Sequence, residues 1–150
     1  MAVIEYARNI KKIRYANSTE ISEKCKDPVI DLMTSQKEII NKGGTMRLGA
    51  WDCEILKNTI SSKIYSKKVV SERHRHRYEF NDEYSKKIFD ENFIVAVKNP
   101  ETNLVEIVEN KDHPWFVGVQ FHPEYKSSVY NPHPIFVNFV KASLKNYLKK

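Results

Sequence analysis

Apolar residues at the start of the sequence recur with the spacing of an α-helix. They are Val3, Tyr6, Ala7 and Ile10. Positions three or four apart share one face of a helix, so an amphipathic helix is expected almost from Met1. No Ser, Thr, Asp or Asn stands before it as an N-cap. An uncapped helix with an apolar face indicates that a preceding element packs against it; a frayed terminus capped by solvent is the alternative.

Short runs of apolar and β-branched residues in the middle of the chain predict β-strands. Residues 93–97 and 104–108 form two such runs, and the polar stretch between them contains Asn99-Pro100. Because Asn-Pro favours a turn, the two runs together predict a β-hairpin. The other strands expected from the same pattern are 28–33, 46–48, 51–56, 66–71 and 116–121.

Two further helices are expected in the second half of the chain. Asn81 or Asp82 is a suitable cap for a short helix over 84–89. Pro134 suits the first turn of a longer C-terminal helix. The apolar stripe of that helix comprises Phe136, Phe139, Val140, Leu144, Tyr147 and Leu148. Helices towards both ends and strands between them predict a mixed α and β fold.

The length and composition describe a single foldable domain. A chain of 150 residues suits one domain with a modest core, and its 41% hydrophobic content argues against disorder. No apolar stretch is long enough to span a membrane and no secretory leader opens the chain, so we expect no membrane partner and a cytoplasmic location. Cys25 and Cys53 lack metal-ligand spacing and a neighbouring histidine, which favours reduced, unreactive thiols.

A net charge of +6 raises the question of nucleic-acid binding, but the lysines are spread through most of the chain. The concentrated run is Arg73–Arg77, with the sequence Arg-His-Arg-His-Arg. Neither interleaved aromatic residues nor a groove-fitting helix surrounds it. His74 and His76, even together with His122, match no zinc-ligand spacing. We therefore expect no nucleic-acid or metal site, and Arg73 and Arg75 would order the segment by pairing with acids such as Glu72 and Glu79.

The segment with the strongest chemical signal is Gln120–Glu124, directly after an apolar run. A histidine at the carboxyl end of a strand lies where α/β folds place reactive groups. Pro123 stiffens the turn, and Glu124 is close enough in sequence to reach the ring of His122. A carboxylate bonded to one ring nitrogen leaves the other nitrogen free as a general base. On spacing alone, a structural histidine beside a turn glutamate is the more common arrangement, and a base also needs a nucleophile.

Longer motifs resemble one enzyme family. Val119–Glu124 resembles the Val-Gln-Phe-His-Pro-Glu signature of class I (triad) glutamine amidotransferases. Gly43–Gly49 and Glu72–Tyr78 resemble stretches of one member of that class, CTP synthase. Further blocks that fit the same family in the same order are Ala16–Glu20, Leu104–Glu109 and Asp112–Pro114. The resemblance extends from Met1 to about Leu148.

The resemblance implies a glutamine-hydrolysing site. The family makes CTP from UTP, ATP and glutamine; a Cys–His–Glu triad releases ammonia, which passes to a synthetase domain. By this resemblance, His122 is the general base and Glu124 its orienting carboxylate. Glu20 would bind the α-ammonium group of glutamine and Arg77 its α-carboxylate, with Tyr78 contributing beside it. The chemistry agrees, because a zwitterionic substrate needs one anion and one bidentate cation.

The resemblance also has a gap. In the family, the nucleophile segment Gly-x-Cys-Leu-Gly-Met-Gln leads into the helix that here begins at Met1. We therefore expect this chain to lack the catalytic cysteine, the adjacent amide of the oxyanion hole and the synthetase domain. Neither Cys25 nor Cys53 is expected to replace the nucleophile. No cofactor is expected, because the ATP, UTP and Mg²⁺ sites belong to the synthetase domain.

These observations lead to one expected fold and function. The fold class is α/β, an incomplete flavodoxin-like class I glutamine amidotransferase fold over 1–150, with a mixed sheet and flanking helices. The function is that of a CTP synthase glutaminase fragment that is inactive alone, whether through a shortened sequence, a misplaced start codon or a broken gene. If completed, its partners would be L-glutamine, the missing N-terminal segment or synthetase domain, and copies in a homo-oligomer. A catalytically dead binding module or the product of a decayed gene is the alternative.

Overall fold

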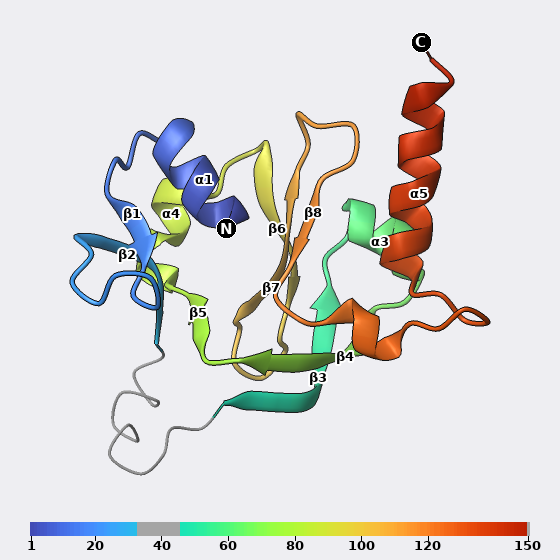
Figure 1. Ribbon diagram of the computed structural model, residues 1–150, viewed down its shortest axis with the longest axis horizontal. Coiled ribbons are helices and arrows are strands. Elements are labelled where there is room, and N and C mark those ends of the chain that lie inside the picture. Colours follow the sequence, from blue (N-terminus) through green and yellow to red (C-terminus); the bar gives the residue numbers. More distant parts are fainter. Residues whose placement is uncertain (33–45, 150) are drawn as a thin grey trace. The chain divides into compact units, whose positions relative to one another are not determined.

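The computed structural model describes residues 1–32 and 46–149 (Figure 1). These residues form two compact units. The first unit combines 1–47 with 75–90, and the second combines 48–74 with 91–150. Two sequence predictions lie partly outside the described residues: the end of the strand at Met33, and residues 43–45 of the glycine-rich motif.

The first unit is built on a three-stranded sheet with the order β1-β2-β5. β1 runs parallel to β2, and β5 runs antiparallel to it with Phe80 opposite Ile30. The sheet is therefore mixed, as the sequence predicts. The elements are α1 (Ala2–Asn9), β1 (Ala16–Ser18), β2 (Asp27–Leu32), β5 (Tyr78–Phe80), the 3₁₀ helix η2 (Asp82–Tyr84) and α4 (Ser85–Ile88). Asn81 caps η2 by accepting a hydrogen bond from the Glu83 amide.

Helix α1 confirms most of the predicted apolar face. It contacts β1, β2 and α4 of its own unit, and its buried residues include Val3, Tyr6 and Ala7. The Tyr6 hydroxyl donates to the carboxylate of Asp90 at 2.9 Å, and this bond attaches the last residue of the unit to the helix. The face ends earlier than predicted, because the helix ends at Asn9 and Ile10 is 59% exposed. Val3 and Tyr6 are therefore buried by their own unit, and the element expected before the helix stays a prediction.

The second unit is built on a five-stranded sheet with the order β4-β3-β6-β7-β8. Strand pairs β3–β6, β6–β7 and β7–β8 are antiparallel. The elements are β3 (Arg47–Ile55), α3 (Ile60–Tyr65), β4 (Val69–His76), β6 (Phe93–Lys98), β7 (Val105–Asn110), β8 (Val117–Val119), the 3₁₀ helix η3 (Pro123–Lys126) and α5 (Pro134–Tyr147). Figure 1 shows β6 and β7 as the predicted hairpin, with α3 and α5 beside each other.

The region between 46 and 76 differs most from the sequence prediction. The two expected strands 46–48 and 51–56 are one continuous strand, β3, which passes through Gly49 at a φ of 86°. Helix α3 was not predicted, although Thr59 and Ser62 form a capping box at its start. Because Ser66 ends that helix in the left-handed conformation, β4 begins at Val69 and extends through His76 instead of covering 66–71.

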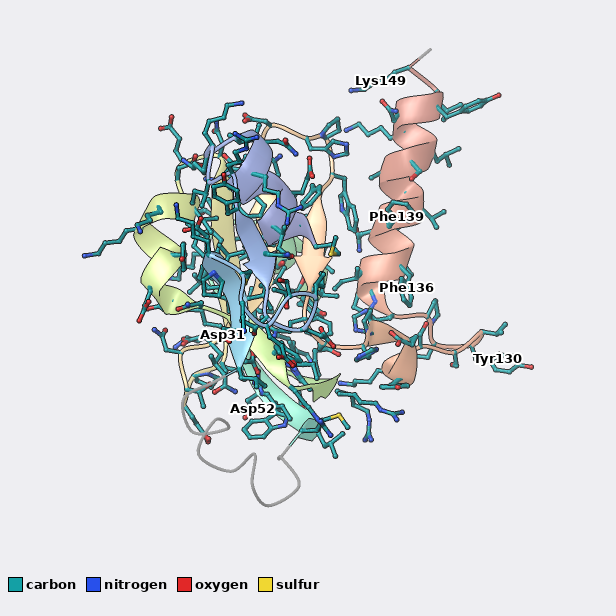
Figure 2. The ribbon with its side chains drawn as sticks, turned by 60° about the vertical axis from the view of Figure 1, so that its left-hand side comes forward. Asp31, Asp52, Tyr130, Phe136, Phe139 and Lys149 are labelled. Atoms are coloured by element: carbon teal, nitrogen blue, oxygen red, sulfur yellow. The ribbon has the colours of Figure 1, made fainter. Side chains whose placement is uncertain are left out.

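The core of the second unit lies between the sheet and the start of α5. Its buried members are Cys53, Ile55, Ala96, Val97, Ile107, Phe121 and Ile135. The predicted stripe on α5 is present but does not join this core: Phe139 is 53% exposed and Val140 is 63% exposed. Figure 2 shows Phe136 and Phe139 on α5, with Tyr130 in the loop before it. Among the described residues, no helix has the length and apolar character needed to cross a membrane.

Candidate functional site

The His122–Glu124 pair lies in the turn that follows β8. His122 directly precedes η3, and Pro123 occupies the first position of that short helix. The turn brings Nδ1 of His122 to 2.6 Å from Oε1 of Glu124. The hydrogen bond from the imidazole lowers the pKa of the Glu124 carboxyl group, so the carboxylate form is favoured. The bond that the sequence spacing suggests is therefore present in the structure.

The pair is accessible to a substrate. The side chains of His122 and Glu124 are 36% and 54% exposed. The ring of Tyr125 stacks on the imidazole, with centroids 5.1 Å apart and an interplanar angle of 27°. Because Nδ1 is bonded to the carboxylate, it carries a proton, and Nε2 is the nitrogen available to accept another. This arrangement is that of an oriented general base.

The backbone of β4 holds this turn in place. The amide of His122 donates to the carbonyl oxygen of Arg73 at 2.8 Å. At the other end of η3, Nζ of Lys126 donates to the carbonyl oxygen of Ser71. Both ends of the turn are therefore attached to one strand.

In the first unit, Glu20, Arg77 and Tyr78 line one cavity of about 500 Å³. Glu20 lies in the turn after β1, where its amide donates to Oγ of Ser18 at 3.1 Å. Arg77 is the single residue between β4 and β5, and Tyr78 begins β5. The other lining residues are Ile30, Met46, Arg75 and His76. Predicted site residues from two separate parts of the sequence are thus brought together.

The cavity has charges suited to a zwitterion. It combines the carboxylate of Glu20 with the guanidinium groups of Arg75 and Arg77, and both Glu20 and Arg77 are exposed to solvent. An α-amino acid presents one cation and one anion, which these groups match.

A buried ionic cluster flanks Arg77 in the first unit. Glu79 is 2% exposed, and its Oε1 lies 3.6 Å from Arg47 and 3.4 Å from Nδ1 of His76. Residues 76 and 79 on the two sides of Arg77 are therefore joined through their side chains. The sequence prediction did not identify this cluster, because Arg47 is distant in the chain.

The run from Glu72 to Arg77 alternates between buried and exposed side chains. Glu72 and His74 are each 2% exposed, and His76 is half-buried. The arginines at 73, 75 and 77 are exposed. Successive side chains of a strand point to opposite faces, and this explains why histidine and arginine alternate. Glu72 binds Tyr65 and His133, so the prediction that it pairs with a nearby arginine is wrong.

Cys53, His74 and Glu106 form a buried cluster that the sequence prediction missed. They lie on β3, β4 and β7, and one potential metal-ligand atom from each lies within 4.8 Å of the others. The statement that neither cysteine has a neighbouring histidine is therefore wrong for Cys53. Nε2 of His74 is 3.7 Å from Oε2 of Glu106. Thiolate, imidazole and carboxylate groups are all possible metal ligands. Cys53 has no exposed surface, so it is not placed to attack a substrate.

Comparison with known proteins identifies the class. The family described as glutamine amidotransferase class-I matches residues 1–142. The chain belongs to the class I glutamine amidotransferase family. Within that family it matches the glutaminase domain of CTP synthase. A solved Trypanosoma brucei CTPS glutaminase domain with bound acivicin has a TM-score of 0.87 and 38% identity, covering 96% of this chain and 56% of that one.

Full-length relatives give the same result. The chain is 56% identical to CTP synthase of Christiangramia forsetii over 150 residues, covering 100% of this chain and 28% of the relative. It is also 56% identical to CTP synthase of Flavobacterium johnsoniae over 149 residues, again covering 28% of the relative. The chain thus spans just over a quarter of the length of these proteins. The predicted family and mixed α/β fold are confirmed, while the roles of individual residues remain predictions.

Proposed function

We propose that this chain forms part of the glutamine-hydrolysing site of a CTP synthase. In this proposal His122 is the general base, Glu124 orients it, and Glu20, Arg77 and Tyr78 bind L-glutamine. The observation that carries the proposal is the 2.6 Å bond between Nδ1 of His122 and the Glu124 carboxylate. It leaves Nε2 on an exposed ring, as a base that serves an external nucleophile requires.

The proposed reaction is acyl transfer through a cysteine. His122 accepts the thiol proton, and the thiolate attacks the side-chain amide carbon of glutamine. The imidazolium then gives that proton to the departing ammonia, leaving a thioester. His122 next deprotonates a water molecule that cleaves the thioester to glutamate and restores the thiol. Glu124 stabilises the imidazolium in both steps, because its pKa is lowered and it stays ionised.

The nucleophile in this proposal comes from chain outside these 150 residues. Cys53 is fully buried, and its neighbours His74 and Glu106 are buried with it. Cys25 lies in the polar segment between β1 and β2. Nearly three quarters of this relative's length lies outside the matched segment, which supports a nucleophile located there. The same proposal includes a synthetase domain with its ATP, UTP and Mg²⁺ sites, a homo-oligomer and a cytoplasmic location.

A hybrid enzyme tests the proposed function. This chain would replace the matching segment of Christiangramia forsetii CTP synthase, to which it is 56% identical. We expect the hybrid to make CTP from glutamine, and His122→Asn to abolish that activity while synthesis from added ammonia continues. Arg73→Ala serves as a control, because Arg73 is exposed and its side chain has no proposed role. A hybrid that uses ammonia normally but gains nothing from glutamine would contradict the proposal.

A further inference from the structure

The second unit contains a buried side-chain network directly behind the strand that holds the His122 turn. Glu72 lies between Ser71 and Arg73 on β4 and is 2% exposed. Its Oε1 accepts a hydrogen bond from the Tyr65 hydroxyl at 2.9 Å and another from Nε2 of His133 at 3.0 Å. Tyr65 is the last residue of α3, and His133 caps α5. One carboxylate oxygen therefore connects β4 to two helices.

The direction of these bonds can be assigned. Nδ1 of His133 accepts the amide hydrogen of Ile135, so its proton is on Nε2, which donates to Glu72. Burial and the neighbouring Glu72 carboxylate raise the pKa of the Tyr65 hydroxyl, which therefore remains a donor. Two donors converge on one oxygen of Glu72, an arrangement that suits the ionised carboxylate.

This network stabilises the core less than apolar side chains of similar size would. Among the described residues, Oε2 of Glu72 has no hydrogen-bond partner. Tyr65, Glu72, Lys126 and His133 also line a cavity of about 470 Å³, so the space is not closely packed. A buried carboxylate that is only half satisfied is less favourable than an apolar side chain of similar size. Such a group is better explained by the geometry that it imposes.

That geometry concerns the edge of β4. In a strand, the carbonyl groups of residues two apart point to the same edge. The carbonyl oxygens of Ser71 and Arg73 bind Lys126 and the His122 amide, at the two ends of η3. Among the described strands, β4 is the terminal one of its sheet and has a neighbouring strand on one side alone. The side chain of Glu72 is the additional restraint between the two carbonyl groups.

We propose that Glu72 is a positioning residue for the His122–Glu124 pair, acting through β4 and held in turn by Tyr65 and His133. The functional meaning of the pair rests on the proposed glutaminase activity, but its geometry does not. If Glu72 no longer holds the strand, the carbonyl groups of Ser71 and Arg73 shift and the turn loosens. The bond between His122 and Glu124 then lengthens.

The pKa of the Glu124 carboxyl group, followed by carbon-detected NMR during a pH titration of the 150-residue chain, reports this bond. Glu72→Met keeps the side-chain length and removes the acceptor, so it should raise the pKa of Glu124 towards its ordinary value. Removal of a negative charge by itself favours other carboxylates and would lower that pKa. The two explanations therefore predict opposite signs.

Two variants provide matched controls. Glu72→Gln retains an acceptor oxygen for Tyr65 and His133 and should not raise the pKa of Glu124. Glu109→Met removes another buried carboxylate, which binds the start of α3 through the amides of Ile60 and Ser61, and should not raise that pKa. A shift with Glu109→Met equal to that with Glu72→Met would mean general loosening of the unit and would overturn the proposal.

A pKa of Glu124 that stays constant or falls in a folded Glu72→Met chain would also overturn it. If that variant does not fold, Tyr65→Phe removes one donor at almost constant volume and should give a smaller rise; no rise would overturn the proposal. The glutaminase hypothesis is separate in this design. A rise in the pKa of Glu124 together with an inactive hybrid enzyme would support the positioning role and contradict the proposed function.

Discussion

Replacement of Arg77 by alanine tests substrate recognition in the first unit. Arg77 lines the cavity of about 500 Å³ with Glu20, and its guanidinium group is exposed. A hydrogen bond to a charged group contributes about 1.5–3 kcal/mol. Solvent screening at an exposed site favours the lower end of this range. At about 1.36 kcal/mol per factor of ten, Arg77→Ala should raise the KM for glutamine about tenfold.

The hybrid CTP synthase provides the assay, with glutamate release measured over a range of glutamine concentrations. A contact made equally in the ground state and the transition state changes KM and leaves kcat unaltered. Arg77→Lys keeps the charge but loses the bidentate fork, so its KM should fall between those of Arg77→Ala and the parent. CTP formation from added ammonia should be unchanged in all three proteins.

Two results would refute this reasoning. Equal loss of activity with glutamine and with ammonia would show that Arg77 supports the structure and does not bind the substrate. An equal rise in KM for Arg73→Ala would show that any positive charge in the run has the same effect. Arg73 is a suitable comparison because it is also exposed and does not line the cavity.

Three other outcomes are expected. The 150-residue chain alone should release no measurable ammonia from glutamine, since loss of a triad nucleophile costs about 10⁶-fold; turnover abolished by Cys25→Ser or Cys53→Ser would instead identify that cysteine as the nucleophile. Because the folded-state pKa of Glu124 is lowered, its bond to His122 stabilises the fold above the unfolded-state pKa, and this contribution is lost as the pH falls through the folded-state pKa. Urea unfolding at several acidic pH values should therefore show a weaker pH dependence for Glu124→Gln, and an identical one would argue against the bond. On α5, Leu144→Lys should change the free energy of unfolding by no more than about 0.5 kcal/mol and increase solubility, because Leu144 is 56% exposed, whereas buried Ile135→Lys should destabilise the chain strongly. A large loss of stability with Leu144→Lys would show that α5 is covered in solution.

The sequence is most informative where local pattern and local structure coincide. The hairpin 93–110 follows from two β-branched runs around one turn, and both strands form within a residue or two of the prediction. The His122–Glu124 bond is also local, because Pro123 and the start of η3 place two residues of one short turn together. The resemblance to CTP synthase identified Glu20 and Arg77 as candidate site residues, since no spacing pattern in the sequence links the two.

Interactions between distant segments could not be predicted in this way. Cys53, His74 and Glu106 meet because three strands bring them together, and the order of strands in a sheet is not apparent from residue spacing. The stripe on α5 shows a second limit: its helical period is correct, but periodicity does not show how much of the face the rest of the unit covers. Helix α3 was overlooked because its capping box lies beside polar residues that resemble a loop.

The alternation in Glu72–Arg77 makes this segment sensitive to changes in chain length. Side chains in a strand exchange faces when the register moves by one residue. A single-residue insertion before Glu72 would turn the guanidinium groups of Arg73 and Arg75 inward and the carboxylate outward. In a scan of one-residue insertions and deletions, this segment should tolerate none, whereas the loop 127–132 should accept several.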